Sequence, residues 1–422
     1  MKPNDIPEQG ASPILDTQPP TALRAINGTA RFLNRAGLVS FNPSPDALIH
    51  SARKRTGLGD FGPWDFDKEL REFVGCFRDQ PRLKYTGIAG LKEMVRNGLE
   101  RRLCLQRDIQ VHPEILGQEI HHPFYVVGFP RSGTTLMQNL LIQHPGCRWM
   151  RPWETMTPFP CKADWGGPAD PRVARYHATA ARVKRRYPTQ DQIHSWDNPG
   201  ECWLLLYASF VAPQLLGSVV LDSYRAWWEK LPPTAFAKAY QFYRLQLQYL
   251  TWCQNGSHWV LKETSHMTQL DHLLGCFPDA RIVQTHRDPG QFMGSICSLI
   301  YYQFRCYDSV QGVTPEEVGR LLLQTCSVWA ARNVALRRQL DAASFFDVPY
   351  PQLVEEPLEV TRRIYHYFGM EFSPDLQSKI EEWLRRHHGI HRPRHHYDLA
   401  QFGLRADQVK EAFKPYCDYF DL

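Results

Sequence analysis

Short apolar runs recur along the chain, and each is followed by a longer segment with apolar residues at helical spacing. The runs have the length and the β-branched or aromatic content of buried strands. They are Phe124–Val127, His258–Lys262, Arg281–His286 and Phe345–Tyr350. The segments between them predict helices, so strands and helices alternate along the chain. This order predicts an α/β fold in which helices flank a mostly parallel sheet.

The segments around this predicted sheet have other patterns. Residues 1–40 begin with a polar, proline-rich stretch and predict a disordered tail. Residues 41–120 have apolar positions at helical spacing and predict a helical N-terminal extension. Within the remaining α/β domain, 121–422, an insertion at about 158–255 continues into aromatic-rich helices. These aromatic side chains could line a pocket for an acceptor molecule, although core packing explains them equally well.

The segment Gly128–Leu136, GFPRSGTTL, joins the first predicted strand to a helix. It has the form of a phosphate-binding loop, in which backbone N–H groups at a helix N-terminus attract an anion. Arg131 adds a permanent positive charge. A nucleoside triphosphatase loop has lysine and then serine or threonine after its last glycine, whereas Thr134 and Thr135 follow Gly133 here. The missing lysine disfavours a metal-dependent triphosphatase.

A second anion-binding element follows the third predicted strand. Arg287 lies at the carboxyl end of Arg281–His286, and Ser295 follows in the next helix. Arg287 and Ser295 could together bind a second phosphate. The two elements therefore predict a nucleotide that carries phosphates at two separate positions.

Taken together, GFPRSGTTL and THRDPGQFMGS resemble the sulfotransferases that use 3′-phosphoadenosine 5′-phosphosulfate (PAPS). The segments WVLKETSHMTQLDHLLGCFPDARIVQTHRDP and YPQLVEEPLEVTRRIYHYFG are similar to the bacterial-type branch, and the resemblance covers about Pro123–Gly369. It implies a P-loop-like fold and transfer of a sulfuryl group to a hydroxyl, less readily an amine, of a small molecule. It also implies PAPS as co-substrate without a metal, which explains the absence of the loop lysine.

The resemblance also assigns roles to individual residues. Lys262 matches a family lysine near the bridging oxygen, so Lys262 and Arg131 are the expected stabilisers of the charge that develops during transfer. The implied cofactor-binding residues are Arg131, Ser132, Gly133, Thr134, Thr135 and Leu136 around the phosphosulfate, Arg287 and Ser295 at the 3′-phosphate, and Tyr350 against the nucleotide.

Two residues compete for the role of general base, which takes the proton of the acceptor. Glu154 resembles a glutamate of the tyrosylprotein sulfotransferases, with a spacing from Arg131 about two residues longer than theirs. His266 stands at the histidine of the family pattern L-K-[ST]-P-x-H, although Glu263 and Thr264 replace its small residue and its proline. We favour Glu154 as the base. For His266, a structural role in which it only holds a turn is at least as plausible as a catalytic one. His194 and Glu201 also look like family positions near the acceptor, but the sequence gives them no role.

Composition narrows the possible partners. The 422 residues carry a net charge of +5, without the concentrated basic face that nucleic-acid binding requires. The eleven cysteines are scattered, with neither C-x-x-C nor zinc-ligand spacing, which predicts reduced thiols in a cytoplasmic protein and no metal site. The basic stretch Arg385–His396 predicts a solvated or ligand-facing loop.

Two alternatives to a sulfotransferase stay open: a P-loop nucleotide kinase or triphosphatase, and a non-catalytic nucleotide-binding protein.

One uncharged segment, Cys202–Leu221, is long enough to span a membrane. Pro213 interrupts it, and no cluster of Lys or Arg flanks it. A single span would also place the phosphate loop and Arg287 on opposite sides of the bilayer. We therefore expect a buried helix pair and no membrane span.

Overall fold

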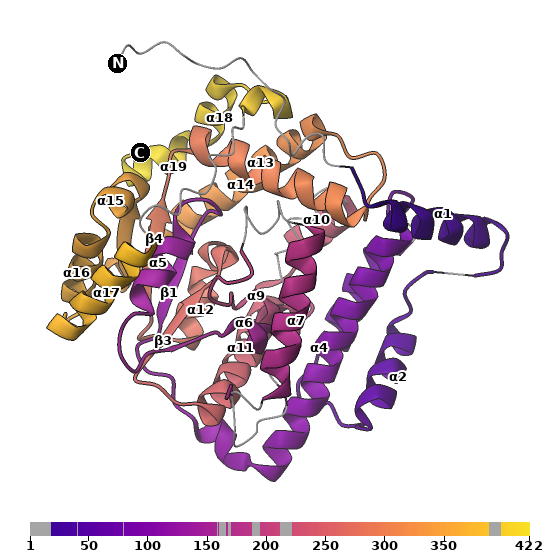
Figure 1. Cartoon of the computed structure of the whole chain (residues 1–422), viewed down its shortest axis with the longest axis horizontal. Coiled ribbons are helices and arrows are strands. Elements are labelled where there is room, and N and C mark those ends of the chain that lie inside the picture. Colours follow the sequence, from indigo (N-terminus) through magenta and orange to yellow (C-terminus); the bar gives the residue numbers. More distant parts are fainter. Residues whose placement is uncertain are drawn as a thin grey trace.

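Five parallel strands form the centre of the protein (Figure 1), in the order β2-β3-β1-β4-β5. They are β1 (Phe124–Gly128), β2 (Arg148–Trp149), β3 (Trp259–Lys262), β4 (Arg281–His286) and β5 (Phe345–Pro349). The computed structural model describes residues 18–39, 41–78, 80–157, 159, 166–167, 170–187, 195–211, 222–387 and 398–422. The predicted α/β fold and its four predicted strands are confirmed. Only β2, with two residues, was too short to give a periodic signal.

The central strand β1 pairs with β3 on one side and with β4 on the other. All of its residues are buried, as expected for a parallel strand covered on both faces. Its C-terminal residue Gly128 stands opposite Thr285 of β4, and Val126 stands opposite Lys262 of β3. Three carboxyl ends therefore meet at one edge of the sheet. Ligands bind at such an edge in open α/β sheets, beside the strand where the order reverses.

Apolar side chains alternate between the two faces of the sheet. Val126, Val260 and Val283 point into one cluster with residues of α5 (Thr134–Leu141), α16 (Pro357–Tyr367) and α17 (Pro374–His387). The opposite face, with Tyr125 and Leu261, packs into the main core. The helices of that core are α11 (Pro233–Cys253), α12 (Leu270–Cys276), α13 (Pro289–Tyr307) and α14 (Pro315–Arg337). Figure 1 shows the two helix layers on either side of the strands.

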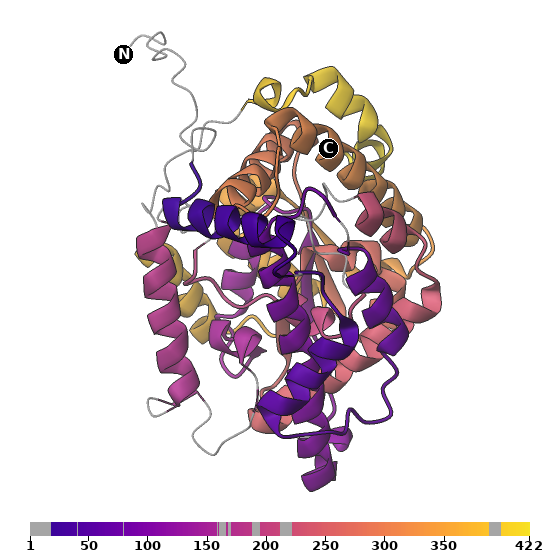
Figure 2. The same cartoon turned by 90° about the vertical axis from the view of Figure 1, so that its right-hand side faces the viewer.

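Helices also precede the sheet within residues 41–120. They are α2 (Pro45–Thr56), α3 (Asp67–Gly75), α4 (Tyr85–Val111) and the short 3₁₀ helix η1 (Pro113–Gly117). The prediction of a disordered tail as far as residue 40 is wrong for Thr21–Arg35, which form α1. This helix lies on the outside of the molecule (Figure 2) and is anchored by a polar contact. The buried Asn27 donates from Nδ2 to Asp308 Oδ2 over 2.7 Å, and a sequence pattern does not reveal such a contact.

The remaining helices lie between β2 and β3 or after β3. They are α6 (Pro152–Met156), α7 (Pro171–Arg186), α9 (Trp203–Tyr207), α10 (Asp222–Glu229), α15 (Tyr350–Glu355), α18 (Ala406–Ala412) and α19 (Lys414–Phe420), with 3₁₀ turns η3 (Thr264–Thr268), η4 (Ala342–Ser344) and η5 (Leu399–Phe402). Among the described helices, none is long and apolar enough to cross a membrane. The uncharged segment is described only as far as Val211, so its second half, 212–221, lies outside the described residues and the expected helix pair stays a prediction.

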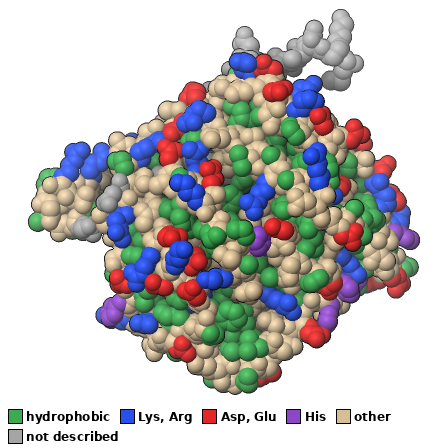
Figure 3. Space-filling view, turned by 180° about the vertical axis from the view of Figure 1, so that it is seen from behind, with side chains coloured by type: hydrophobic (Ala, Val, Ile, Leu, Met, Phe, Trp, Pro, Cys, Tyr) green, Lys and Arg blue, Asp and Glu red, His purple; other side chains and the backbone are tan. Residues whose placement is uncertain are grey.

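Charged side chains of both signs are interspersed over the face seen in Figure 3. Lys and Arg do not merge there into one continuous basic surface among the described residues. The basic stretch Arg385–His396 begins with the last residues of α17, and its residues 388–396 lie outside the part of the chain that the structure describes, so its predicted role stays a prediction.

Candidate active site

The loop between β1 and α5 has an unusual backbone. Arg131 has a φ of 73° and Gly133 a φ of 97°, both in the left-handed region, which costs free energy for a residue with a side chain. A Cβ on Gly133 would lie 2.9 Å from Cδ2 of Tyr350. A Cβ on Gly128 would lie 2.4 Å from the carbonyl oxygen of Thr285. The neighbouring strands and Tyr350 therefore fix the loop in one shape, and only glycine fits at these two positions.

This shape leaves the start of α5 open to an anion. Gly133 is the N-cap residue, and no side chain caps the helix. The N–H groups of Thr134, Thr135 and Leu136 form the first turn and have no acceptor within the helix. The side chain of Leu136 packs, partly buried, against the apolar cluster under α5. The first turn therefore offers three backbone donors and the positive end of a helix dipole.

The side chain of Ser132 stabilises the loop from inside. It is fully buried, its Oγ donates to the carbonyl oxygen of Phe129 over 2.6 Å, and it is hydrogen-bonded to Thr285 Oγ1 over 2.7 Å. Both contacts lie within the protein. Ser132 therefore positions the loop, and the loop backbone is the part available to an anion.

The structure brings the two predicted anion-binding elements together. Arg131 Nε donates to Ser295 Oγ over 3.0 Å. Arg287 Nη1 donates to the carbonyl oxygen of Arg131 over 2.9 Å. The Arg287 guanidinium also lies 4.3 Å from the centre of the Tyr350 ring. Residues that are far apart in the sequence thus form one cationic surface beside the first turn of α5.

Lys262 supplies a cation that the loop itself lacks. It lies at the end of β3, with a side chain only 3% exposed. Its Nζ donates to Thr135 Oγ1 over 3.1 Å and forms an ion pair with Glu201 Oε1. The Cys202 N–H donates to the Lys262 carbonyl oxygen over 3.1 Å, which fixes the segment of Glu201 at the same strand end. The Glu201 side chain is 20% exposed. It therefore contacts Lys262 and is also accessible from solvent.

A second carboxylate follows Lys262 directly. Glu263 is buried, and its Oε1 accepts from the Ser265 N–H over 2.9 Å. Burial, together with the neighbouring charge of Glu201, raises the pKa of Glu263 to about 7. The sequence shows that Glu263 departs from the family pattern. That Glu263 lies close to Glu201 could be seen only in the folded structure.

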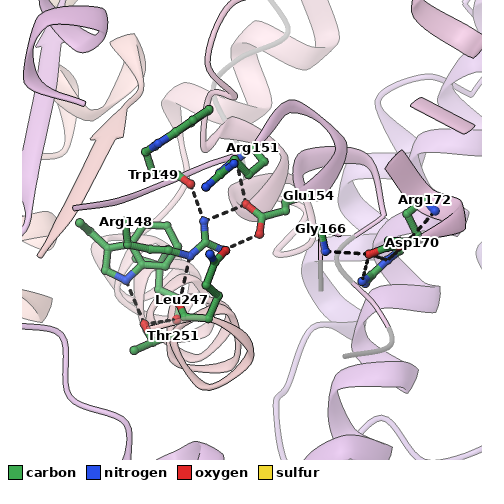
Figure 4. Close-up of polar contacts among 11 residues, drawn as sticks. Arg148, Trp149, Arg151, Glu154, Gly166, Asp170, Arg172, Leu247 and Thr251 are labelled. Atoms are coloured by element: carbon green, nitrogen blue, oxygen red, sulfur yellow. Dashed lines mark hydrogen bonds and ion pairs between the residues drawn. The ribbon is translucent and has the colours of Figure 1, made fainter. Parts of the chain in front are cut away.

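Glu154, the base favoured from the sequence, lies in a different environment (Figure 4). Its side chain is fully buried, and both carboxylate oxygens pair with Arg148, over 3.0 Å to Nη1 and 2.5 Å to Nη2. The Arg151 N–H donates to Glu154 Oε2 over 2.7 Å. The Arg148 guanidinium also lies 4.5 Å from the ring centre of Trp259. These contacts are those of a buried ion pair that joins β2, β3 and α6, and they leave no exposed face toward an acceptor.

His266 is also enclosed. Its Nδ1 is hydrogen-bonded to the Tyr240 hydroxyl over 2.7 Å, and Cys202 Sγ lies 3.6 Å from its Nε2. The rings of Tyr125 and Tyr243 pack against it. Burial lowers the pKa of His266 to about 3. The contacts fit the alternative role considered from the sequence, a histidine that holds the turn after β3.

The described residues contain no group of three or more His, Cys, Asp or Glu side chains that could hold a metal ion. His194, a further family-like position, lies outside the described residues. The site thus consists of a backbone anion cradle, the cations Arg131, Arg287 and Lys262, and the carboxylates Glu201 and Glu263. Such a site is suited to hold a doubly phosphorylated nucleotide and to stabilise charge that develops on a transferred anionic group.

Comparison with known proteins agrees with this geometry. The model of the sulfotransferase family matches residues 123–374, which is more than half of the chain. Sulfotransferase STF1 from Mycobacterium tuberculosis H37Rv is 27% identical, with 89% of this chain and 99% of that chain covered and a TM-score of 0.77. Sulfotransferase STF9 from Mycobacterium avium is 26% identical, with 89% and 96% covered and a TM-score of 0.79. No curated protein sequence matches the chain. The chain belongs to the sulfotransferase family.

Proposed function

We propose that this chain transfers the sulfuryl group of PAPS to a hydroxyl group of a small-molecule acceptor, without a metal ion. The observation that carries the proposal is the meeting of Arg131, Arg287 and Ser295 beside the open first turn of α5. A nucleoside triphosphate would leave the second of these anion sites without a matching group. PAPS has a phosphate for each site.

The residues present fit this donor. The first-turn N–H groups of α5 and the guanidinium of Arg131 would hold the 5′-phosphosulfate. Arg287 and Ser295 would hold the 3′-phosphate, and Arg287 keeps Nη2 without a hydrogen-bond partner among the described residues. Tyr350 would lie against the nucleotide. PAPS, when bound, supplies an activated sulfuryl group for transfer.

Lys262 would stabilise the charge that develops on the departing oxygen. Its Nζ already contacts Thr135 in the first turn of α5, so it lies at the edge of the anion cradle. A fixed cation in a site shielded from water stabilises developing negative charge more strongly than a solvated one. The lysine that triphosphatases carry within the loop is thereby replaced by a lysine from β3.

Glu201 would act as the general base in place of Glu154. It is partly exposed and lies beside Lys262, whereas Glu154 is enclosed by Arg148 and the Arg151 backbone. The carboxylate of Glu201, which pairs with Lys262, is the form that can accept a proton. The proton of the acceptor hydroxyl would therefore pass to a carboxylate oxygen of Glu201.

The test measures transfer of radiolabelled sulfate from PAPS to a panel of phenols and alcohols, with EDTA present. Wild type should yield labelled product, and Glu201→Gln should lose roughly 10²–10⁴-fold in turnover while it still binds the desulfated nucleotide PAP. Asp197→Asn, an exposed carboxylate in the preceding turn, is the control and should keep its activity. Undiminished turnover in Glu201→Gln would exclude Glu201 as the base.

A further inference from the structure

The helix α1 and the turn that follows it carry a concentration of exposed apolar side chains. Of the thirteen large hydrophobic side chains that are exposed among the described residues, four lie within residues 26–39, namely Ile26, Phe32, Leu38 and Val39. Phe32 and Leu38 are each 69% exposed. Figure 2 looks onto this end of the molecule, and α1 lies in its foreground. Exposed apolar residues that are scattered singly need no explanation, whereas a group of them marks an interaction surface.

The helical spacing shows which side of α1 faces outward. Asn27 and Ala30 are the buried residues of α1 and attach it to the protein. Ala25 and Phe32 each lie two residues away from one of them, which corresponds to the opposite side of a helix with about 3.6 residues per turn. The side of α1 that faces away from the protein is therefore apolar.

The charge of this segment has one sign. Residues 17–45 contain three arginines and no aspartate, glutamate or lysine. The arginines are Arg24, Arg31 and Arg35, whose side chains are exposed and whose spacing places them on one face of α1, next to its outer side. Arg24 and Arg31 donate to neutral oxygens, those of Thr21 and Gln311, so these contacts leave their charges uncompensated. A partner that covers this surface must therefore combine apolar and anionic groups.

We propose that α1 binds, parallel to the surface, to membranes that contain anionic lipids. Phe32 and Leu38 would enter the boundary between headgroups and acyl chains, and the arginines would reach the lipid phosphates, as in helices that lie in the membrane interface. With fifteen residues, α1 is too short to span a bilayer. A second copy of this chain fits less well, because a symmetric contact through α1 would bring the same arginines together. The proposal does not rest on the proposed sulfuryl transfer.

The charges and the apolar side chains make separable contributions to this binding. Each arginine close to an anionic membrane strengthens binding roughly 5-fold, so the three together contribute roughly 100-fold. Burial of the Phe32 ring contributes roughly 10-fold, since part of this side chain is already covered in the free protein. Membrane binding through α1 should therefore depend both on the charge of the lipids and on Phe32.

The test is sedimentation of the whole chain with vesicles of phosphatidylcholine alone or of equal parts phosphatidylcholine and phosphatidylserine. The chain should bind the mixed vesicles, bind the phosphatidylcholine vesicles roughly 100-fold more weakly, and lose affinity as salt is added. Phe32→Ser should weaken binding to the mixed vesicles roughly 10-fold. Val111→Ser, at an apolar residue of α4 that is 66% exposed, is the matched control and should leave this binding unchanged.

A second pair of variants separates the charge of α1 from the net charge of the protein. Arg24→Gln combined with Arg35→Gln should weaken binding to the mixed vesicles roughly 20- to 30-fold, whereas Arg385→Gln combined with Arg386→Gln, at the end of α17, should leave it unchanged. Each variant replaces exposed side chains, and calorimetric melting checks that it folds. Absence of binding to the mixed vesicles would overturn the proposal, as would equal binding by wild type and Phe32→Ser. A dimer in sedimentation velocity that Phe32→Ser converts to a monomer would identify a second copy as the partner and would also overturn it.

Discussion

Replacement of Glu154 by glutamine distinguishes a buried structural ion pair from a catalytic base. The substitution removes the negative charge that pairs with Arg148 inside the protein, where the Arg148 side chain is 3% exposed and that of Glu154 is 0% exposed. Removing one partner of a buried ion pair typically costs roughly 3–5 kcal/mol, because the other charge stays buried without compensation. The reasoning therefore predicts a loss of stability as the first effect.

The size of the expected shift in melting temperature follows from the length of the chain. Unfolding entropy of about 2.1 cal/mol/K per residue gives about 0.9 kcal/mol/K for 422 residues that unfold as one unit. A loss of roughly 3–5 kcal/mol then lowers the melting temperature by roughly 3–6 °C. Differential scanning calorimetry measures this shift. Glu382→Gln, which breaks an exposed ion pair with Arg386, is the matched control and should cost no more than about 1 kcal/mol.

Activity and a double variant complete the test. Turnover of Glu154→Gln, measured at a temperature where the variant is folded, should stay within about 10-fold of wild type, since a base would lose 10²–10⁴-fold. Arg148→Met combined with Glu154→Leu should regain stability, because replacing both partners of a buried pair by apolar groups is often neutral or stabilising. A variant Glu154→Gln with an unchanged melting temperature and a turnover reduced 100-fold or more would refute the reasoning and restore Glu154 as the base.

Three further predictions concern the loop and the end of β3. Lys262→Met should reduce turnover, measured by steady-state kinetics, at least about 100-fold with little effect on PAP affinity. A large loss of PAP affinity with little change in turnover would show that Lys262 only binds nucleotide. Gly133→Ala should weaken PAP binding, because its Cβ would lie 2.9 Å from Tyr350 at a φ of 97°; calorimetry checks this, and normal affinity would contradict the proposed fit. Glu263 has a pKa raised from 4.5 to about 7 in the folded protein, so the folded state binds its proton more tightly and stability should fall as pH rises between these values. Glu263→Gln should flatten that part of the stability profile, and an unchanged profile would contradict the burial argument.

The sequence predicted those parts of the fold that depend on local patterns. The four longer strands contain short apolar runs, and the loop GFPRSGTTL has glycines where the backbone takes left-handed or crowded conformations. Arg287 and Ser295 could be placed because each lies at a fixed distance from a predicted strand end. Their meeting with Arg131 followed from the parallel sheet, in which the carboxyl ends of neighbouring strands share one edge.

Contacts between distant segments could not be predicted in the same way. The ion pair of Lys262 with Glu201 joins residues 61 positions apart, and neither residue has a sequence signal for the other. Arg148 pairs with Glu154 because the strand β2 places it at the edge of the sheet. This strand has only two residues, so no hydrophobic period in the sequence predicts it. The helix α1 was missed because a buried asparagine fixes it to Asp308. In each case a polar tertiary contact decided the outcome, and hydrophobic periodicity does not report such contacts.

The central claim is that two anion sites hold PAPS without a metal, and PAP binding tests it most directly. Calorimetric titration should compare PAP with ATP, first in EDTA and then with Mg²⁺, for wild type and for Arg287→Ala. The account predicts tight PAP binding that does not change with Mg²⁺ and is lost in Arg287→Ala, with much weaker binding of ATP. Preferential binding of Mg²⁺-ATP, or PAP binding that survives in Arg287→Ala, would contradict it.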